Sequence, residues 1–187
     1  MQRQGLAPGL LLAAPPLGDP NFEHSVIVLA QHSGEGALGW VANGAEVASV
    51  EQLLRDSGLT PEGTELPNAI AYANKVRIGG PVSPRSAWLL YRRDPKWSHS
   101  GEILLSELWA ATGSRDLIEK VARGEGPLEF RVFLGYSGWA ADQLETEVGA
   151  GAWLPTNFDE GIVFETDPEQ MWQEAYERLI GVSPFAF

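Results

Sequence analysis

A serine between two glycines is the residue of this chain whose neighbours best suit nucleophilic chemistry. Ser137 lies in the segment GYSGW, between a strand-like run and a short amphipathic one. A nucleophile elbow has the pattern G-x-S-x-G on a strand–turn–helix, but Trp139 replaces the last glycine here. The hydrolase order also needs a histidine after the serine, and the last histidine is His99. The pattern favours a structural turn and leaves a hydrolase-like enzyme using Ser137 as the alternative.

A loop near the N-terminus offers a second kind of chemistry. Asp19 and His24 lie close together in it, and a histidine near a carboxylate can act as a general base or bind a metal ion. The histidines form no H-E-x-x-H frame, and no cysteine is present to complete a zinc site. We therefore expect no metal and no cofactor. The Asp19/His24 loop remains the other candidate site for an enzyme acting on a small substrate.

The segment GGPVSPRS could present backbone N–H groups to an anion. Gly79, Gly80 and Pro81 begin it, and Ser83 and Arg85 follow. Successive N–H groups of a glycine-rich backbone can form an anion-binding nest. The segment lacks the lysine and the length of a P-loop, so it is interpreted first as a turn.

Composition limits the classes of function. The net charge is -12, from 25 acidic and 13 basic residues, and the basic residues form no stripe, which argues against direct binding of nucleic acid. The chain has no cysteine, which is typical of a cytoplasmic protein. No apolar run reaches the ~20 residues of a membrane span, so we expect no membrane association.

Short apolar runs separated by glycine and proline predict β-strands through much of the chain. The run 25–31 is continuous and rich in β-branched residues. The run 129–136 alternates, which places Leu134 and Tyr136 on one face and Phe133 on the other. Further strands are expected at 10–14, 37–43, 75–82, 87–92, 102–106, 152–155 and 161–165.

Capping residues and periodic apolar positions predict the helices. Ser49 and Gln52 have the spacing of a capping box, and Ser114 precedes a second helix that ends at a glycine. A third helix is expected from Ala140 and a last one after Asp167 and Pro168. The polar segment 59–69 is expected to form the one long loop. Strands grouped by hairpins, with scattered helices, predict an α+β fold.

Glycines at two strand ends suggest where a functional surface would lie. Because backbones approach closely at glycines and leave amide groups that need acceptors, we expect the Gly79–Val82 turn to meet the Gly135–Glu145 segment. Any binding surface would follow this seam; the alternative is that its contacts only hold the fold. The residues of the seam are Gly79, Gly80, Pro81, Tyr136, Trp139, Gln143 and Glu145.

Together these segments resemble the bacterial AlgH/YqgE family. The resemblance runs through GLLLAAPPLGDPNFEHSVIVLAQHSGEGALGWVAN, IGGPV, LGYSGWAADQLETEV, AWLP and a closing W…A…IG. It implies a compact single domain over 1–187, with a split, barrel-like mixed sheet and three or four helices packed around it. Members have been described as proposed transcriptional regulators, named through alginate production, and the resemblance brings no established reaction or ligand.

The chain departs from the family pattern at places that matter for ligand binding. His24 stands where the pattern has arginine, and Gly44 replaces the arginine of the usual Asn-Arg-Pro. The position of Ser137 is often alanine in the family. Because the sequence shows no catalytic triad, metal-binding frame or phosphate loop, we expect a non-enzymatic cytoplasmic protein that binds a protein partner or a small ligand, with any regulation of transcription being indirect.

Overall fold

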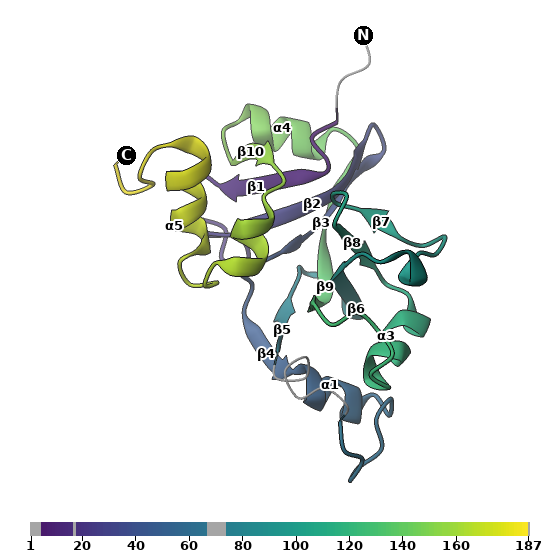
Figure 1. Cartoon of the computed structure of the whole chain (residues 1–187). Helices are drawn as coiled ribbons and strands as arrows, with labels where there is room; N and C mark the ends of the chain where they lie inside the picture. Colours follow the sequence, from purple (N-terminus) through teal and green to yellow (C-terminus); the bar gives the residue numbers. More distant parts are fainter. Residues whose placement is uncertain (1–4, 17, 67–73, 187) are drawn as a thin grey trace.

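Ten strands form one mixed sheet in the computed structural model, which describes residues 5–16, 18–66 and 74–186 (Figure 1). Eight of them follow the order β10-β1-β2-β3-β9-β6-β8-β7, and β5 joins β9 from the side with β4 beyond it. Strands β5 and β9 run parallel, whereas the other pairs in the described ranges are antiparallel. The sheet is not closed. The predicted α+β fold is confirmed.

Short helices are scattered among the strands along the chain. The strands are β1 (Gly9–Ala13), β2 (Val26–Ser33), β3 (Gly36–Val41), β4 (Glu46–Ser49), β5 (Lys75–Ile78), β6 (Val82–Arg92), β7 (Ile103–Leu104), β8 (Trp109–Thr112), β9 (Phe130–Ala140) and β10 (Trp153–Asn157). The α-helices are α1 (Val50–Asp56), α3 (Arg115–Ala122), α4 (Gln143–Gly149) and α5 (Met171–Ala175). Shorter helical turns are η1 (Pro95–Trp97), η2 (Gly161–Glu165) and η3 (Tyr176–Ile180).

Both faces of the first two strands are buried, because apolar residues occupy successive positions along them. Leu10 and Val28 join an inner core cluster with Trp172 of α5. Leu11 and Ile27 belong to a second cluster on the opposite face, which α4 covers. Helices on both sides of one sheet thus bury the continuous apolar runs that the sequence shows.

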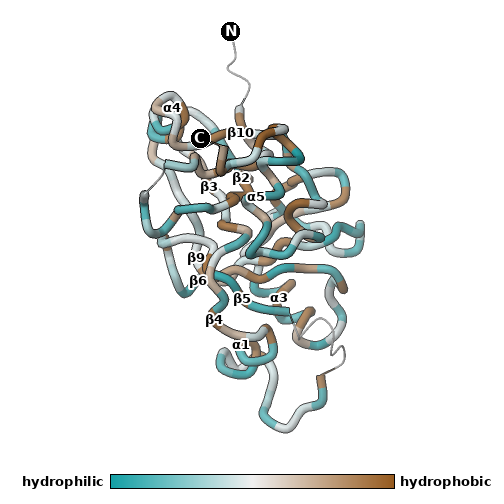
Figure 2. Tube along the Cα trace, turned by 90° about the vertical axis from the view of Figure 1, so that its left-hand side faces the viewer, coloured by the Kyte–Doolittle hydropathy of each residue, from teal (hydrophilic) through white to brown (hydrophobic). Residues whose placement is uncertain are grey.

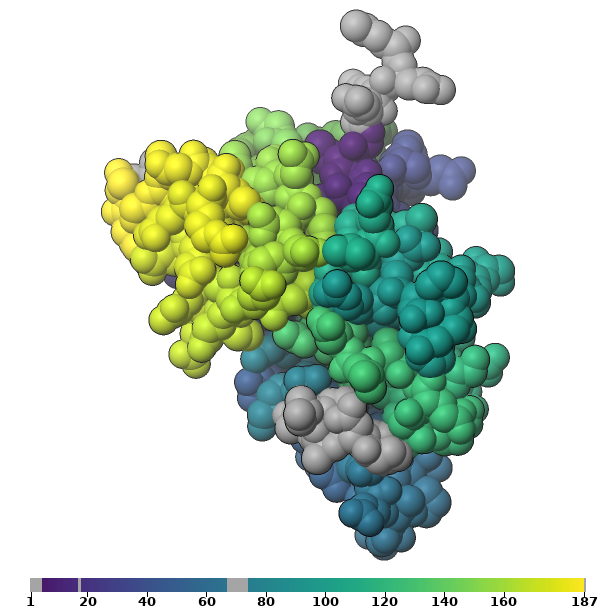
Figure 3. All heavy atoms as spheres, in the orientation of Figure 1, coloured from purple at the N-terminus to yellow at the C-terminus, as the bar shows by residue number. Residues whose placement is uncertain are grey.

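A third cluster lies on the outer face of the other half of the sheet. There Val50 and Leu54 of α1, with Leu117 of α3, pack against Val76 and Val132. In Figure 2 the hydrophobic segments run mainly through the strands, while the loop beyond α1 is mostly hydrophilic. Figure 3 shows the C-terminal residues, in yellow, forming one side of the molecule and the blue residues around α1 forming its lower end.

Strand β9 bends at Gly135 and joins the two halves of the sheet. Residues 132–134 pair with β5 and with β6, whereas residues 137–140 pair with β3. Gly135 has φ +70°, a left-handed conformation in which a side chain is strained. Such a residue interrupts the alternation of a strand. Tyr136 consequently packs on the inner cluster rather than beside Leu134 as predicted.

The Gly79–Gly80 turn fits against this bend. The N–H group of Gly79 donates to Leu134 O at 2.8 Å, and its carbonyl accepts from Val41 N at 2.9 Å. A Cβ atom on Gly79 would lie 2.5 Å from the carbonyl oxygen of Gly135, and one on Gly80 would overlap the backbone of Tyr136. Only glycine fits here, so the ends of β3 and β5 can meet the middle of β9.

The segment 161–165 is helical in the structure, and the predicted strand is wrong. The side chain of Asp159 accepts from Ile162 N at 2.9 Å and so starts a helical turn. Ile162 and Val163 are both buried in the inner cluster. Adjacent residues of a strand would point to opposite faces, whereas adjacent residues of a helical turn can both contact one core.

Two predicted helix starts also lie too early. Strand β9 continues to Ala140, which pairs with Gly36, so α4 begins only at Gln143. Asp167 accepts from Glu169 N in a turn before α5 rather than capping the helix.

Strands β4 and β8 were not predicted, and part of the expected loop 59–69 lies outside the described residues. Within the described ranges, no helix is long and apolar enough to cross a membrane.

We expect the substitution Gly135→Ala to lower the free energy of unfolding by roughly 2–5 kcal/mol. An alanine is strained in the left-handed backbone conformation, and its methyl group would overlap the carbonyl oxygen of Gly80. Urea unfolding measures the change. Gly149→Ala is the control, since open space surrounds that position at the end of α4 and its expected effect is within about 1 kcal/mol. Equal stabilities of the two variants would contradict the constraint.

Candidate functional site

Ser137 lies inside strand β9 and not on a strand-to-helix turn. It is fully buried, and its Oγ donates to the carbonyl of Gly79 at 3.0 Å. The sequence interpretation of a turn is wrong because the ladder with β3 extends to Ala140. A buried hydroxyl that already bonds a backbone carbonyl joins the glycine turn to the sheet and is closed to a substrate.

The two segments of the predicted seam meet only in part. Val82 pairs with Tyr136, and Gly79 bonds Leu134 as described above. Gln143 and Glu145 lie on α4 and serve other contacts. The side-chain oxygen of Gln143 accepts from Ala140 N at 3.0 Å and secures the start of the helix. The binding role of the seam remains a prediction.

Glu145 pairs with a histidine on β2. His32 Nδ1 accepts from Leu6 N at 3.0 Å, so Nε2 carries the proton in the neutral ring and donates to Glu145 Oε1 at 2.9 Å. This contact ties α4 to β2 and to the chain before β1. Sequence reasoning missed it because 113 residues separate the two partners.

The carboxylate of Glu147 holds two buried indoles, a role that the sequence analysis did not assign. Its Oε2 accepts from Trp139 Nε1 at 2.9 Å and from Trp153 Nε1 at 2.8 Å. Its Oε1 accepts from Gln143 at 2.9 Å. Trp139 is only 7% exposed, so most of its ring lies in the core. The acidic side of α4 is thus partly structural.

One surface hollow brings together two of the segments singled out by sequence. This His24 hollow has a volume of about 330 Å³, and both His24 and Glu23 line it from the loop before β2. Gly80 and Pro81 line it from the turn after β5. Its remaining lining residues are Pro20, Asn21, Ser25, Val41, Asn43, Gly44, Ala45 and Ile78. Positions 24 and 44, where the chain departs from the arginines of the resembled family, therefore face the same space.

Local hydrogen bonds hold His24 in place. Its backbone is left-handed, with φ 53°, and its carbonyl accepts from Asn43 Nδ2 at 3.0 Å. Asn43 Oδ1 accepts from Val26 N at 2.9 Å, so the Asn43 side chain is bonded to the backbone of both His24 and Val26. The imidazole stacks on Trp172, with ring centroids 4.1 Å apart. Trp172 in turn donates to Ala13 O at 2.8 Å, which fixes the platform beneath the imidazole.

Asp19 supports the loop but does not line the hollow. Its side chain accepts from Asn21 N at 2.9 Å, and its carbonyl accepts from Phe22 N and Glu23 N. The hydroxyl of Ser25 is buried and donates to Phe22 O at 2.7 Å. The side chains of Asp19 and Ser25 thus form hydrogen bonds within the loop and stabilise its conformation.

A second, more open hollow lies on the other side of the Gly79–Val82 turn. Tyr136, Trp139 and Val82 line it together with residues of the β2–β3 hairpin, and its volume is about 400 Å³. The seam therefore separates two hollows. The one beside His24 is the more enclosed.

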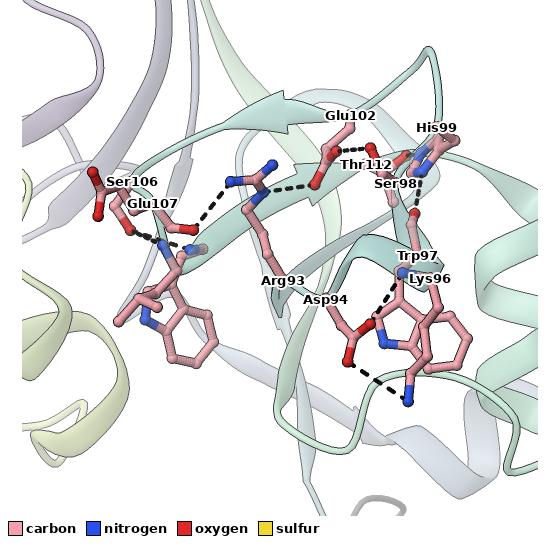
Figure 4. Close-up of polar contacts among 12 residues, drawn as sticks. Arg93, Asp94, Lys96, Trp97, Ser98, His99, Glu102, Ser106, Glu107 and Thr112 are labelled. Carbon is pink, nitrogen blue, oxygen red and sulfur yellow. Dashed lines mark hydrogen bonds and ion pairs between the residues drawn. The ribbon is translucent and has the colours of Figure 1, made fainter.

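A dense polar cluster lies in the connection between β6 and β8 (Figure 4). Glu102 accepts from Arg93 at 2.9 Å. Burial acts to raise the pKa of the Glu102 carboxyl, but hydrogen bonds and the charge of Arg93 outweigh it and lower the pKa. His99 donates from Nδ1 to Trp97 O and accepts from Thr112 at Nε2, both at 2.8 Å. This cluster binds its own loop together.

These observations define an α+β protein with an open mixed sheet and two shallow hollows beside a glycine turn. In the part of the chain that the structure describes, no group of three or more acidic or histidine side chains is arranged to hold a metal ion. No hydrogen bond in the same ranges joins the His24 imidazole to a carboxylate or hydroxyl.

Comparison with known proteins gives the family. Residues 10–183 match the AlgH-like family. A UPF0301 protein from Anaeromyxobacter dehalogenans is 40% identical over 185 residues, 98% of this chain and 92% of that protein. The solution structure of AlgH from Pseudomonas aeruginosa has a TM-score of 0.77 at 31% identity, with 98% and 94% of the two chains covered. The chain belongs to the AlgH-like family.

A more distant structure shows that the fold persists as the sequence diverges. A protein from Corynebacterium diphtheriae has a TM-score of 0.71 at 18% identity, covering 95% of this chain and 89% of that one. This likeness concerns the fold alone.

We expect Glu147→Ala to lower the free energy of unfolding by roughly 2–4 kcal/mol, because two buried indole N–H groups lose their acceptor. Glu147→Gln keeps a side-chain oxygen and should lose less. Urea unfolding followed by tryptophan fluorescence measures both. Glu62→Ala, at an exposed position, is the control. A stability loss no larger than that of the control would show that the carboxylate is dispensable.

Proposed function

We propose that this protein is a non-enzymatic binding protein whose site is the His24 hollow. The observation that carries the proposal is the convergence of the His24 loop and the Gly80–Pro81 turn on one surface hollow. Each wall is fixed by its own hydrogen bonds, from Asn43 on one side and from the glycine turn on the other. A site that is already rigid loses little entropy when a ligand binds.

The lining of the hollow favours a protein partner. Val41, Ala45, Ile78 and two prolines give it apolar walls, and the exposed carboxylate of Glu23 stands at its edge. Such a space suits an apolar side chain with a basic group nearby. The net charge of -12 disfavours an approach to nucleic acid. Any regulation of transcription would then act through the partner. We place the protein in the cytoplasm, because a chain without cysteine is typical of that reducing compartment.

A cysteine-free chain allows the partner surface to be mapped with single cysteines. In Ala45→Cys the only thiol lies where the His24 hollow meets a neighbouring hollow lined by Arg77, whereas in Ala150→Cys it lies on the exposed end of α4. Each purified variant would carry a maleimide photocrosslinker and be illuminated in extract of the native host. We expect a discrete protein adduct from the Ala45 position and none from the Ala150 position.

Competition makes this test specific. Excess unlabelled wild-type protein should remove the adduct, whereas excess Ala45→Trp, in which the indole fills the hollow, should not. Identical adducts from both positions, or equal competition by Ala45→Trp, would place the partner surface elsewhere.

A catalytic role makes a different prediction. Because Ser137 is buried and the His24 imidazole stacks on Trp172 without a bonded carboxylate, we expect no turnover of esterase, phosphatase or peptidase substrates above the buffer rate. Chromogenic assays with pure wild type, Ser137→Ala and His24→Ala test this. Turnover that disappears in His24→Ala, with unchanged thermal stability, would overturn the binding proposal in favour of an enzyme.

A further inference from the structure

Three basic side chains share one face of the sheet where β5 lies beside β9. Arg77 pairs with Phe133 in the parallel register, so Lys75 falls beside Arg131 two residues earlier. Cross-strand partners, and residues two apart along a strand, project from the same face. Phe133 belongs to the inner core cluster, so this is the face that η2 and α5 partly cover (Figure 1).

The positive charge of this group is only partly neutralised. Arg77 pairs with Glu46 at 2.8 Å and donates to Gly44 O at 2.8 Å. In the described ranges, no carboxylate lies within ion-pair distance of Lys75 or Arg131. Three of the 13 basic residues of an acidic chain are thus gathered around one point. Like charges on neighbouring strands repel each other, which costs stability.

Arg131 is held rigidly in this position. Its guanidinium donates to Phe130 O at 3.0 Å and to Phe164 O at 2.8 Å, and it lies over the Phe164 ring. Burial, and then the charge of Arg77, lower the pKa of Arg131, and the negative charge of Glu129 offsets only part of this effect. Backbone carbonyls fix the direction of the group and leave further N–H donors for another acceptor.

These side chains surround a small pocket between the sheet and the C-terminal segment. Its volume is about 70 Å³, enough for one small polar group, and Lys75, Arg77 and Arg131 line it. Phe133 and Val163 form an apolar wall. The carboxylates of Asp167 and Glu169 line an adjoining hollow that shares Arg77, and Asp167 already accepts from a backbone N–H.

We propose that this cationic pocket binds an oxyanion, namely the carboxylate or phosphate group of a small ligand. The guanidinium groups would bind its oxygens through directed N–H bonds, and the exposed Lys75 would add a mobile charge at the entrance. The bound anion would relieve the repulsion among the three cations. The pocket shares no lining residue with the His24 hollow, so the inference does not depend on the proposed function.

Titration of the full chain, followed by amide NMR spectra, tests the inference. Sodium phosphate and sodium butyrate are added separately, with sodium chloride keeping the ionic strength constant. At least one of the two salts should cause saturable chemical-shift changes of the Val76 and Val132 amides. The salt that does so identifies whether the pocket binds a phosphate or a carboxylate. In Lys75→Gln the dissociation constant should rise about tenfold, the effect of one lost charged hydrogen bond.

Lys96→Gln is the matched control, because it removes the same charge from another exposed lysine in the connection between β6 and β8. Its dissociation constant should stay within about twofold of wild type, since an exposed distant charge is screened. Circular dichroism establishes that both variants fold. No saturable shift with either salt, or equal weakening in both variants, would overturn the proposal.

Discussion

The left-handed backbone of Gly135 is the constraint on which the rest of the structure depends. One strand, β9, serves both halves of the sheet, and it can do so only because it bends there. Before the bend it pairs with β5 and β6, and after it mainly with β3. The turn at Gly79 and Gly80 fills the inside of the bend so closely that neither residue tolerates a Cβ atom. Backbone hydrogen bonds from Val41 and to Leu134 close the junction.

The bend also divides the core into layers. The inner cluster lies on the face covered by η2 and α5, and outer clusters lie under α4 and under α1 with α3. Each helix is short, so packing on the sheet rather than helix propensity stabilises it. Polar contacts reinforce this packing at single points, as where Glu147 joins α4 to two tryptophans and where Glu145 reaches His32.

The surface features follow from the same geometry. The glycine turn that closes the junction separates the His24 hollow from the open hollow at Tyr136. The parallel pairing of β5 with β9 gathers Lys75, Arg77 and Arg131 around a third space in a chain that is otherwise strongly acidic. Three hollows of different character therefore lie around one strand junction.

The sequence by itself determined the α+β class, most of the strands and the family, because apolar runs, glycine turns and long motifs such as GYSGWAADQLETEV are local signals. It also indicated that Gly79 and Gly135 lie at close backbone contacts. Only the tertiary structure decided that Ser137 is buried in a strand, that Ile162 and Val163 form a helical turn, and that Glu147 holds two indoles. The same limit applies to the candidate site, since His24 and Pro81 are far apart in the chain and meet only through the fold. These outcomes depend on contacts between residues that are far apart in the sequence. A pattern within a short window of sequence does not identify the residue that a strand end or a carboxylate will contact.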